Sequence, residues 1–287
     1  MNTEQCPVCE KHLEVGLYEW HLKCPACRYE GSTLGPVINS SPAHELIDEA
    51  KREHGLRTLR TQNFQTLLAR IKALKNQGDR LLEVGSAHGW FLELARLDFD
   101  VTGIEPDRNI LDGLDDKTLP IRCGYFPHVL NNDEKFDVIV FNDVIEHIPD
   151  IKTTLSMCHQ HLNEGGLLVL NLPNSDGVFY RLAKFLVRCS SGSAFNRLWQ
   201  KGLPSPHVHY FNPANLNGLL NQYGFDIKEK GTLPTLVRQG LHDRISLAKG
   251  LGPVARNAIY LSVLTALPVL RLLPGDIFYS ISQRQTG

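Results

Sequence analysis

The sequence lacks an excess of charge of either sign. Its 287 residues include 30 Lys and Arg and 31 Asp and Glu, which gives a formal net charge of −1. A protein that holds nucleic acid or an anionic membrane by its overall field carries a basic excess, so this balance indicates neither partner. Internal repeats and low-complexity segments are also missing, so a repeat array is not expected.

Targeting and membrane-spanning patterns are missing as well. The start of the chain, Met1-Asn2-Thr3-Glu4, does not have the basic-then-apolar layout of a signal peptide. No apolar run reaches the ~20 residues that a spanning helix needs. The longest candidate, 258–270, is interrupted by Pro268 and stops at Arg271. We therefore expect a cytoplasmic protein.

From residue 80 onward, short apolar runs alternate with segments of helical periodicity. The expected strands are 80–85, 100–105, 119–123, 136–142, 167–172, 225–230 and 276–283, and the expected helices are 89–97, 108–114, 151–162 and 213–223. Alternation of this kind predicts a parallel sheet with helices on both faces. The expected fold class is α/β, with a Rossmann-like, doubly wound and mostly parallel sheet.

Changes of composition divide the chain into three parts. The N-terminal part has two Cys-x-x-Cys pairs and no helical periodicity, and Gly35-Pro36 marks its end. The second part favours helix, and we expect Gly55 to break it in two. The predicted domains are a zinc ribbon at 1–36, a helical linker at 37–79, and a sheet domain at 80–287 with inserts at 175–206 and 238–273.

A glycine turn follows the first predicted strand of the sheet. Gly85 and Gly89 allow positive φ and close approach of a ligand, and the helix that follows offers unpaired N–H groups. Glu105 ends the next strand, where a carboxylate can accept hydrogen bonds from both ribose hydroxyls of an adenosine-containing cofactor. Ala87 stands where the dinucleotide fingerprint requires glycine, so that fingerprint fails. Glu83 would repel a pyrophosphate but favours a ligand with an ammonium, although a plain strand–turn–helix is the alternative.

The region from about 80 to 230 resembles the class I S-adenosylmethionine-dependent methyltransferases. Glu83-x-Gly85-x-x-x-Gly89 matches the first motif, with Ala87 in place of its middle glycine, and Glu105 matches the ribose-binding acid. Segments 136–150 and 165–174 are similar to the fourth-strand and fifth-strand motifs of the branch that contains quinone and sugar methyltransferases. The resemblance implies that S-adenosylmethionine is bound by Glu83, Gly85, Ser86, Gly89, Glu105, Pro106, Tyr125, Phe126 and Asn142, with Tyr125 and Phe126 at the adenine and Asn142 near the methyl group.

Two histidines are the candidates for catalysis. Methyl transfer from a sulfonium is an in-line displacement, so positioning supplies much of the rate and a base matters mainly for a hydroxyl or carbon acceptor. His147 follows the fourth predicted strand of the sheet, and His207 lies in a segment that the resembling branch places near the acceptor. Structural roles for both remain the alternative. Asp143, Glu146 and His147 offer a loose divalent-metal set, which we do not favour.

Four cysteines near the N-terminus form a pattern typical of zinc ribbons. Cys6, Cys9, Cys24 and Cys27 make two Cys-x-x-Cys pairs separated by 14 residues. Two such turns complete the tetrahedral shell of one structural Zn²⁺ without an open catalytic position. Redox-active or unligated thiols are the alternative. The three scattered cysteines, Cys123, Cys158 and Cys189, are expected to be buried apolar residues.

The charge of the ribbon argues against nucleic acid as a partner. Residues 1–36 carry three basic and five acidic side chains, a net charge of −2, whereas a phosphate-binding module is basic. We expect a small-molecule acceptor, a sugar or a lipid-linked intermediate. An RNA methyltransferase and a non-catalytic zinc-ribbon binding protein with this fold are the competing hypotheses, and the oligomeric state is not indicated.

The sequence predicts an amphipathic helix over 178–188. Arg181, Lys184 and Arg188 share one face, and Phe179, Leu182, Phe185 and Leu186 share another. Such a helix can lie on an anionic membrane surface, although a lid or an ordinary core helix with a solvated basic side is the favoured interpretation. The apolar segment 258–270 and Leu272-Leu273 add weight to a lipid-linked acceptor. Peripheral contact with the inner face of a membrane is the alternative to a purely cytoplasmic location.

Overall fold

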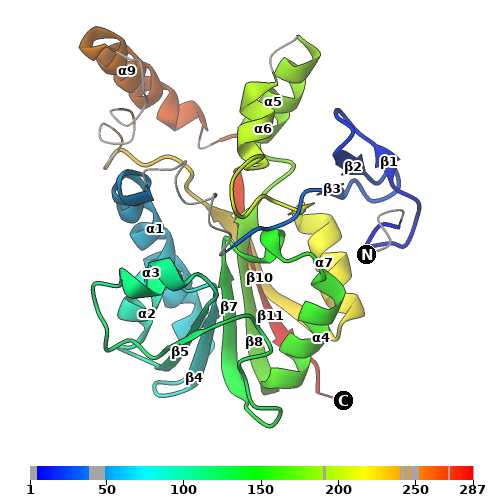
Figure 1. Ribbon diagram of the computed structural model, residues 1–287, viewed down its shortest axis with the longest axis vertical. Helices are drawn as coiled ribbons and strands as arrows, with labels where there is room; N and C mark the ends of the chain where they lie inside the picture. Colours follow the sequence, from blue (N-terminus) through cyan, green and yellow to red (C-terminus); the bar gives the residue numbers. More distant parts are fainter. Residues whose placement is uncertain are drawn as a thin grey trace.

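The computed structural model describes residues 5–38, 49–189, 192–239, 241, 245, 252–270 and 272–286, without the side chains of 49–55. A seven-stranded sheet runs through its centre in the order β10-β11-β8-β7-β4-β5-β6 (Figure 1). Its strands are β4 (Arg80–Val84), β5 (Asp100–Glu105), β6 (Ile121–Cys123), β7 (Phe136–Asn142), β8 (Leu162–Pro173), β10 (Phe225–Leu233) and β11 (Ile277–Arg284). Six strands run in one direction and β11 runs in the other. The α/β class and the mostly parallel sheet are confirmed.

Helices cover both faces of the sheet, because the strand residues are apolar on both sides. The helices are α1 (Glu49–Lys72), α2 (Trp90–Ala95), α3 (Arg108–Asp112), α4 (Ile151–His161) and α7 (Pro213–Gln222). In β7, Val138 and Val140 pack with residues of α1 and α2, whereas Ile139 and Phe141 pack with residues of α4 and α7. This alternation is the two-residue period of a strand.

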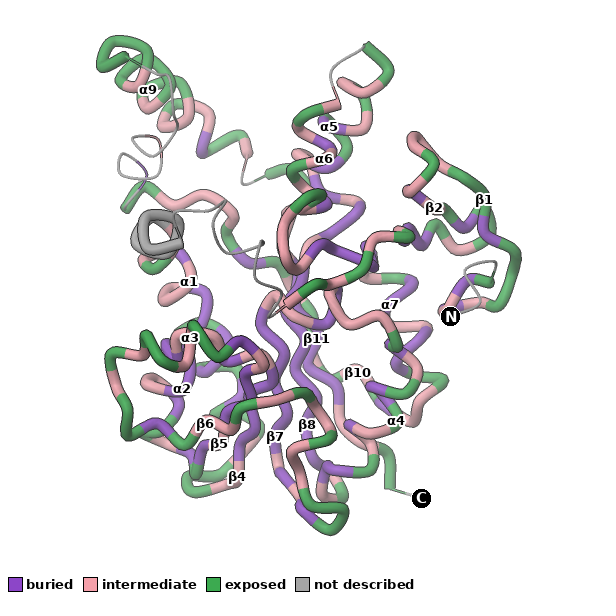
Figure 2. The backbone as a smooth tube through the Cα atoms, viewed as in Figure 1, coloured by how far each residue is buried: buried purple, intermediate pink, exposed green. Residues whose placement is uncertain are grey.

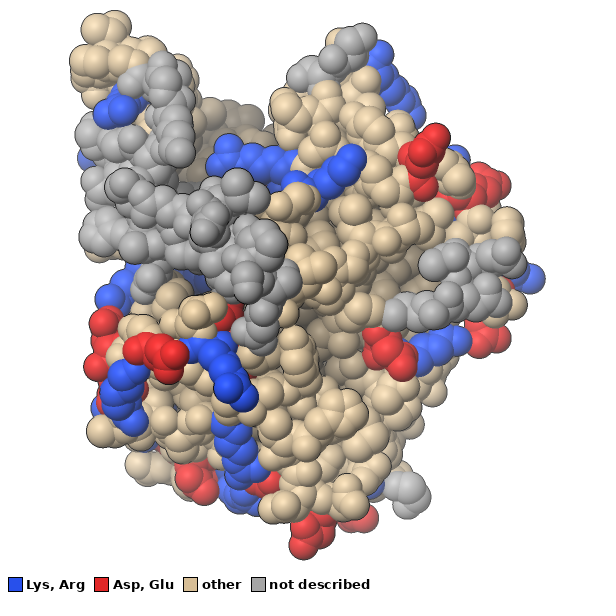
Figure 3. All heavy atoms as spheres, viewed as in Figure 1, with Lys and Arg blue, Asp and Glu red and all other residues tan. Residues whose placement is uncertain are grey.

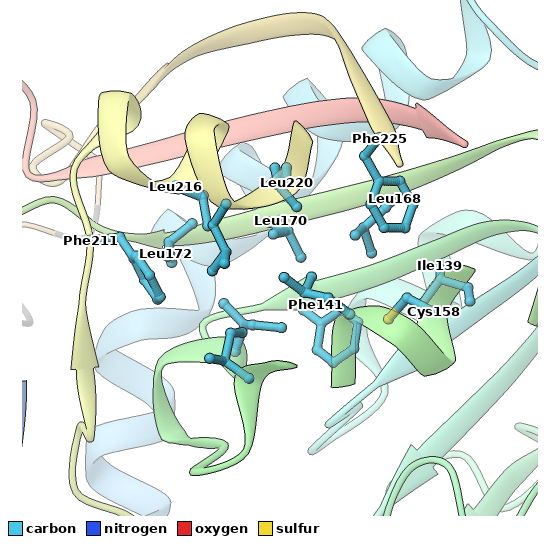
Figure 4. Close-up of a cluster of buried hydrophobic side chains, with 14 of the residues drawn as sticks. Ile139, Phe141, Cys158, Leu168, Leu170, Leu172, Phe211, Leu216, Leu220 and Phe225 are labelled. Carbon is cyan, nitrogen blue, oxygen red and sulfur yellow. The ribbon is translucent and has the colours of Figure 1, made fainter. Parts of the chain in front are cut away.

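The layer between the sheet and helices α4 and α7 is the largest of three clusters of buried apolar side chains among the described residues (Figure 4). Phe141 from β7, Leu170 from β8, and Leu216 and Leu220 from α7 are fully buried there. Burial of each such side chain stabilises the fold by about 1.5–3 kcal/mol relative to exposure. The buried residues follow the strands through the whole molecule (Figure 2).

Helix α1 corrects one expectation from the sequence. It continues from Glu49 to Lys72 without a break, so the prediction that Gly55 divides this stretch is wrong. A glycine inside a helix costs only about 1 kcal/mol. Leu67 and Ile71, which are fully buried against the sheet, offset that cost. The part of the 37–79 segment before Glu49 is described only to residue 38.

The N-terminal region forms a small antiparallel sheet with a strand from much later in the chain. Strands β1 (Glu14–Val15), β2 (His21–Lys23) and β3 (Glu30–Ser32) pair in order, and β9 (His209–Tyr210) completes the sheet beside β3. Cys6, Leu13 and Tyr29 belong to the same buried cluster as the large core. The ribbon is therefore joined to the rest of the protein by backbone pairing and by apolar packing.

Two helical arms project from one end of the molecule, at the top of the view in Figure 1. One arm is α5 (Val178–Arg188) with α6 (Ser193–Leu198), and the other is α9 (Pro253–Leu270). Helix α9 continues through Pro268 and has 18 residues, which makes it long and apolar enough to cross a membrane by length and composition. The expectation that the apolar stretch begins at 258 and is too short is thereby corrected.

Candidate active site

The cofactor residues predicted from the sequence come together at one edge of the sheet. Glu83 lies near the end of β4, Glu105 is the last residue of β5, and Asn142 is the last residue of β7. These strands are neighbours, with β4 between the other two. The chain leaves β4 toward β5 on one side and returns to β7 on the other. Open α/β sheets bind their ligands at such a switch point.

Glu83 is the most perturbed carboxyl group of this edge. It is 2% exposed, and one oxygen accepts a hydrogen bond of 2.9 Å from the side-chain amide of Asn142. Its other oxygen and Oδ1 of Asn171 are buried and have no hydrogen-bond partner among the described residues. Burial, reinforced by nearby Glu105, raises the pKa of Glu83 to about 8. Buried acceptors in this state are suited to a cationic donor such as the ammonium of an amino-acid ligand.

The turn after β4 takes the conformation that its glycines permit. Gly85 and Gly89 have φ of 72° and 76°. A Cβ on Gly85 would lie 2.5 Å from Val144, and one on Gly89 would lie 2.4 Å from Leu119. Both positions therefore require glycine. Ala87 also has positive φ, 43°, so the position where the family usually has its middle glycine keeps that backbone shape at some strain.

Glu105 supports this turn in addition to lining the edge of the sheet. Its two carboxylate oxygens accept hydrogen bonds from the N–H groups of Ala87 (2.9 Å) and Asp107 (2.8 Å). Burial raises the pKa of Glu105, and the two N–H groups partly offset this effect. A carboxylate has about four acceptor positions, so two remain for ribose hydroxyls. Sequence reasoning missed the supporting role because backbone donors are invisible in a motif.

The remaining predicted cofactor residues have different surroundings. The loop after β6 begins at Gly124, whose N–H donates to the carbonyl oxygen of Glu105 (3.0 Å). Tyr125 in this loop is 51% exposed, whereas Phe126 turns back and contacts Phe141 and His161. Ser86 is buried, and its hydroxyl has no hydrogen-bond partner in the described part of the chain. Pro106 directly follows Glu105.

The two candidate histidines meet beside a buried glutamate. The 3₁₀ helix η2 (Ile145–His147) begins three residues after β7 ends, and the ring centroids of His147 and His207 lie 4.7 Å apart. One ligand atom from each of Glu146, His147 and His207 lies within 4.8 Å of the others. Both carboxylate oxygens of Glu146 are buried without a hydrogen bond to any described residue, and burial raises its pKa well above the ordinary value.

Hydrogen bonds fix the orientation of both rings. His147 Nδ1 lies 3.0 Å from the carbonyl oxygen of Pro206, so Nδ1 is the donor, and its Nε2 lies 4.0 Å from Glu146. The side-chain amide of Gln200 lies 3.0 Å from Nε2 of His207 and donates to it. The divalent-metal set considered from the sequence, Asp143 with Glu146 and His147, is not the set that the structure brings together. Asp143 lies 3.8 Å from Arg60, and His207 stands beside Glu146 and His147 instead. A carboxylate with two imidazoles is a donor set that divalent metals accept.

The ribbon holds the segment that carries His207. The Ser32 hydroxyl donates to the carbonyl oxygen of His207 (2.8 Å), and the N–H of Val208 donates to the carbonyl oxygen of Glu146 (2.8 Å). The neighbouring His209 bonds the Tyr29 hydroxyl and, through Nε2, the carbonyl oxygen of Ile148 (2.9 Å). Burial lowers the pKa of His209 to about 4, so this imidazole is neutral and structural.

Glu30 joins the ribbon to the α5 arm. It is 6% exposed and accepts hydrogen bonds from Tyr180 (2.8 Å) and Lys184 (2.5 Å) of α5, and it lies 2.8 Å from His21 of the ribbon. Although burial acts to raise it, these partners hold the pKa of Glu30 below its ordinary value. No local motif predicts this node, since Glu30 and Tyr180 are 150 residues apart.

The four N-terminal cysteines converge as their spacing predicts. Their Sγ atoms all lie within 4.8 Å of one another, with Cys6–Cys27 at 3.5 Å and Cys9–Cys24 at 3.4 Å. These separations are far longer than the ~2.05 Å of a disulfide and close to the ~3.8 Å expected between ligands of a Zn–S tetrahedron. The donor set therefore fits a structural Zn²⁺.

The scattered cysteines follow the prediction only in part. Cys158 is fully buried in α4, as expected. Cys123 and Cys189 are exposed, so the prediction of buried thiols is wrong for these two. Cys123 ends the short edge strand β6, and Cys189 follows the last residue of α5. Their positions on an edge strand and an arm leave them outside the three core clusters.

Solved structures share this fold. A chain of the complex between the Haloferax volcanii Trm112 methyltransferase activator and its putative methyltransferase aligns at a TM-score of 0.58 with 14% identity, covering 85% of this chain and 98% of that one. Magnesium protoporphyrin IX methyltransferase from Synechocystis PCC 6803, solved with bound SAH, aligns at 0.53 with 14% identity, covering 80% and 86%. These likenesses concern the fold alone.

Curated relatives are ubiquinone biosynthesis O-methyltransferases. The human mitochondrial protein is 35% identical over 164 residues, which are 53% of this chain and 42% of that protein. The protein from Paramagnetospirillum magneticum is also 35% identical, over 159 residues that are 53% of this chain and 61% of its own length. The chain thus spans about half the length of the curated relatives it matches.

A family match covers the sheet and its site. The methyltransferase domain family matches residues 52–230, which is more than half of the chain and includes β4, β5, β7, β8 and η2. The match agrees with the strand order, the glycine turn and the acids at the strand ends. The chain therefore belongs to the methyltransferase domain family and carries an S-adenosylmethionine-dependent methyltransferase domain.

Proposed function

We propose that the protein transfers the methyl group of S-adenosylmethionine to a hydroxyl group of a small-molecule acceptor that carries an apolar portion. The observation that carries the proposal is the adjacency of two sites along β7. This strand ends at Asn142, which bonds Glu83 of the cofactor edge, and the chain reaches the pair of Glu146 and His147 four residues later. Cofactor and acceptor groups are thereby held on one rigid support.

Each side chain has a defined task in this proposal. Bound S-adenosylmethionine supplies the electrophilic methyl group, with its ammonium at Glu83 and its ribose at Glu105. His147, whose Nδ1 is engaged by Pro206, presents Nε2 to the acceptor hydroxyl and accepts its proton. Such a base contributes ~10²–10⁴-fold to the rate. His207 contacts the His147 ring edge-on and positions it.

Two observations support the proposed class of acceptor, namely the relatives and an apolar groove on the surface. The relatives named above are O-methyltransferases of ubiquinone biosynthesis, which supports a phenolic hydroxyl on a tailed molecule. An apolar groove of about 290 Å³, lined by residues such as Phe179, Leu233 and Leu270, lies beside the α5 and α9 arms and suits such a tail. A lipid-linked sugar is the second candidate, and the acidic ribbon disfavours RNA.

Calorimetric titration with S-adenosylmethionine and S-adenosylhomocysteine tests the cofactor site first. Loss of two ribose hydrogen bonds to a charged group in Glu105→Ala should weaken binding by at least about 100-fold. Asp112→Ala, an exposed acid in α3, is the matched control and should bind like the wild type. Absence of binding to either compound by wild-type protein would overturn the proposal.

Turnover assays then test the acceptor. The wild type should methylate tailed phenols faster than untailed phenols or nucleotide sugars, and His147→Ala should lose turnover while keeping its affinity for S-adenosylhomocysteine. Turnover on polyprenyl-linked sugars alone would move the assignment to the second candidate. Intact cofactor binding without turnover on any acceptor would support a binding protein that kept the fold.

A further inference from the structure

Helix α9 is an apolar helix that the rest of the described chain leaves largely exposed. Only 6% of its 18 residues are buried, and Leu267 is the buried residue among them. Val254, Leu261 and Val269 are 82%, 58% and 61% exposed. Arg256 is its single charged residue. A helix that is apolar all round is stable when an apolar medium surrounds it, and water does not supply one.

Helix α5 also turns an apolar stripe outward. Its core-facing residues are Tyr180 and Ala183, which pack against α6 and the ribbon. Leu182 and Phe185, from the apolar face that the sequence predicts, are 50% and 59% exposed. The favoured interpretation of this helix from the sequence is a lid or an ordinary core helix. The exposure of this face contradicts an ordinary core helix, and the lid stays a prediction.

The two arms are attached to neighbouring strands, β8 and β11, at the same end of the sheet. Helix α5 begins five residues after β8 ends, and α9 ends seven residues before β11 begins. The first residue of β11, Ile277, pairs with Pro173, the last residue of β8. Val178 of α5 and Leu267, Leu270 and Leu273 of the α9 arm line the apolar groove between them. Both arms project from this end of the molecule (Figure 1).

The inserts that contain the arms concentrate the positive charge of the chain. Segments 175–206 and 238–273 each have five Lys and Arg and one Asp, so together they carry ten basic and two acidic residues, a net charge of +8. Because the whole chain has a net charge of −1, the remainder carries −9. Lys and Arg gather at the tip of the α5 arm and in the gap between the arms (Figure 3). This charge matches an anionic lipid surface.

Topology decides how α9 can meet a bilayer. The helix is about 27 Å long at 1.5 Å per residue, close to the thickness of a hydrocarbon core. It connects β10 to β11, which are neighbours in one sheet, so both of its ends must return to the same side. A crossing would require residues 234–252, with Arg238, Arg244 and Lys249, to pass back through hydrocarbon, which is prohibitively costly.

We propose that α5 and α9 form one surface that binds an anionic lipid bilayer, with α9 lying in the interface of one leaflet and the apolar groove opening toward the lipid. Delivery of a lipid-borne acceptor through the groove rests on the proposed function. Vesicle binding does not, and it is measured without turnover.

Co-sedimentation of the full-length protein with vesicles tests the surface. The wild type should bind vesicles of phosphatidylcholine mixed with phosphatidylglycerol at low salt, and should bind weakly to phosphatidylcholine alone or at high salt. The exposed residues Arg181 and Arg188 each attract the surface, so Arg181→Gln with Arg188→Gln should weaken binding about 30-fold. Leu261→Glu with Val269→Glu should weaken it by at least about tenfold.

The matched control is Leu97→Glu. Leu97 is 72% exposed and precedes β5, at the opposite edge of the sheet from the arms. This variant should bind vesicles like the wild type, and all variants should keep the wild-type affinity for S-adenosylhomocysteine, which shows that they fold. Equal loss in Leu97→Glu, or no sedimentation of the wild type with anionic vesicles at low salt, would overturn the proposal.

The depth of α9 in the leaflet is measured by the quenching of tryptophan fluorescence in Leu261→Trp by brominated lipids. Quenching beyond that of the wild-type protein supports burial of α9 in the leaflet, and unchanged quenching in vesicle-bound protein contradicts it. A second copy of the chain is the other candidate to cover α9. If sedimentation velocity shows a dimer that Leu261→Glu with Val269→Glu dissociates, and the wild type ignores vesicles, the surface is a protein interface instead.

Discussion

The cofactor side of this site and the side that we propose for the acceptor are built in different ways. The cofactor side takes Glu83, Glu105 and Asn142 from the ends of three neighbouring strands, all within 60 residues of sequence. The acceptor side joins His207 and His209 to a ribbon about 180 residues earlier, through Ser32 and Tyr29. The first depends on the geometry of the sheet, and the second depends on contacts between distant segments.

Because of this difference, we expect that the proposed acceptor side can be disrupted without loss of cofactor binding. The sheet edge is supported by cores on both faces, in which strand residues such as Val140 and Phe141 are fully buried. The ribbon has strands of only two or three residues, too short to be stable alone. Damage to the ribbon should therefore disable the acceptor side while the cofactor side keeps its ligand.

Loss of a cysteine ligand should have the largest effect. We propose that the four cysteines hold a structural zinc ion. Structural zinc contributes about 10–16 kcal/mol to the folding of small zinc modules, so Cys24→Ser should then release the metal and unfold the ribbon. Displacement of His207 by an ångström or more should then reduce turnover by at least about 100-fold. Metal analysis, turnover and calorimetry with S-adenosylhomocysteine measure the three quantities. Affinity for S-adenosylhomocysteine should change less than threefold, which corresponds to less than about 0.7 kcal/mol.

Cys123→Ser is the control for this variant, since Cys123 is an exposed thiol outside the cluster. It should keep the metal and the turnover. Full turnover of zinc-free Cys24→Ser would show that the ribbon does not shape the acceptor site. Loss of S-adenosylhomocysteine binding in the same variant would show that the two sides are not separable.

The contrast also explains what the sequence could predict. The positions of the strands, the acids at strand ends and the cysteine cluster follow from local patterns, because a buried parallel strand and a Cys-x-x-Cys turn each specify their own geometry. The bond between Tyr29 and His209 and the node at Glu30 depend on tertiary packing that no window of sequence contains. The length of helix α9 was underestimated because its first residues, 253–257, include Arg256 and Asn257 and therefore lie outside the apolar run.

A pH titration sharpens the comparison on the cofactor side. The pKa of Glu83 is raised from 4.5 to about 8 by burial, so between these values the folded protein holds a proton that the unfolded chain releases. Stability should therefore fall as pH rises through this window. The ammonium ligand needs the ionised carboxylate, so affinity for S-adenosylhomocysteine should rise by up to about 30-fold between roughly pH 6 and 7.5.

Glu83→Gln should remove most of that slope, whereas Asp112→Asn, in the exposed helix α3, should keep it. His209 of the acceptor side should not contribute, because its lowered pKa of about 4 keeps it neutral throughout the range. Calorimetry at several pH values measures the slope. A slope that persists in Glu83→Gln would assign the titration to another group.

The smallest expected effect concerns the backbone of the turn itself. Ala87 has φ of 43°, a conformation that costs a residue with a Cβ about 1–2 kcal/mol. Ala87→Gly relieves this strain but increases the freedom of the unfolded chain, so the net gain in unfolding free energy should be about 0.5–1 kcal/mol. Ala69→Gly, at an exposed position inside α1, should instead lose about 1 kcal/mol. Chemical denaturation measures both, and opposite signs for two identical substitutions would show that the strain belongs to the turn. Equal losses would mean that Ala87 fits its turn without strain, and the cofactor side would then tolerate departure from the family's glycine at no cost.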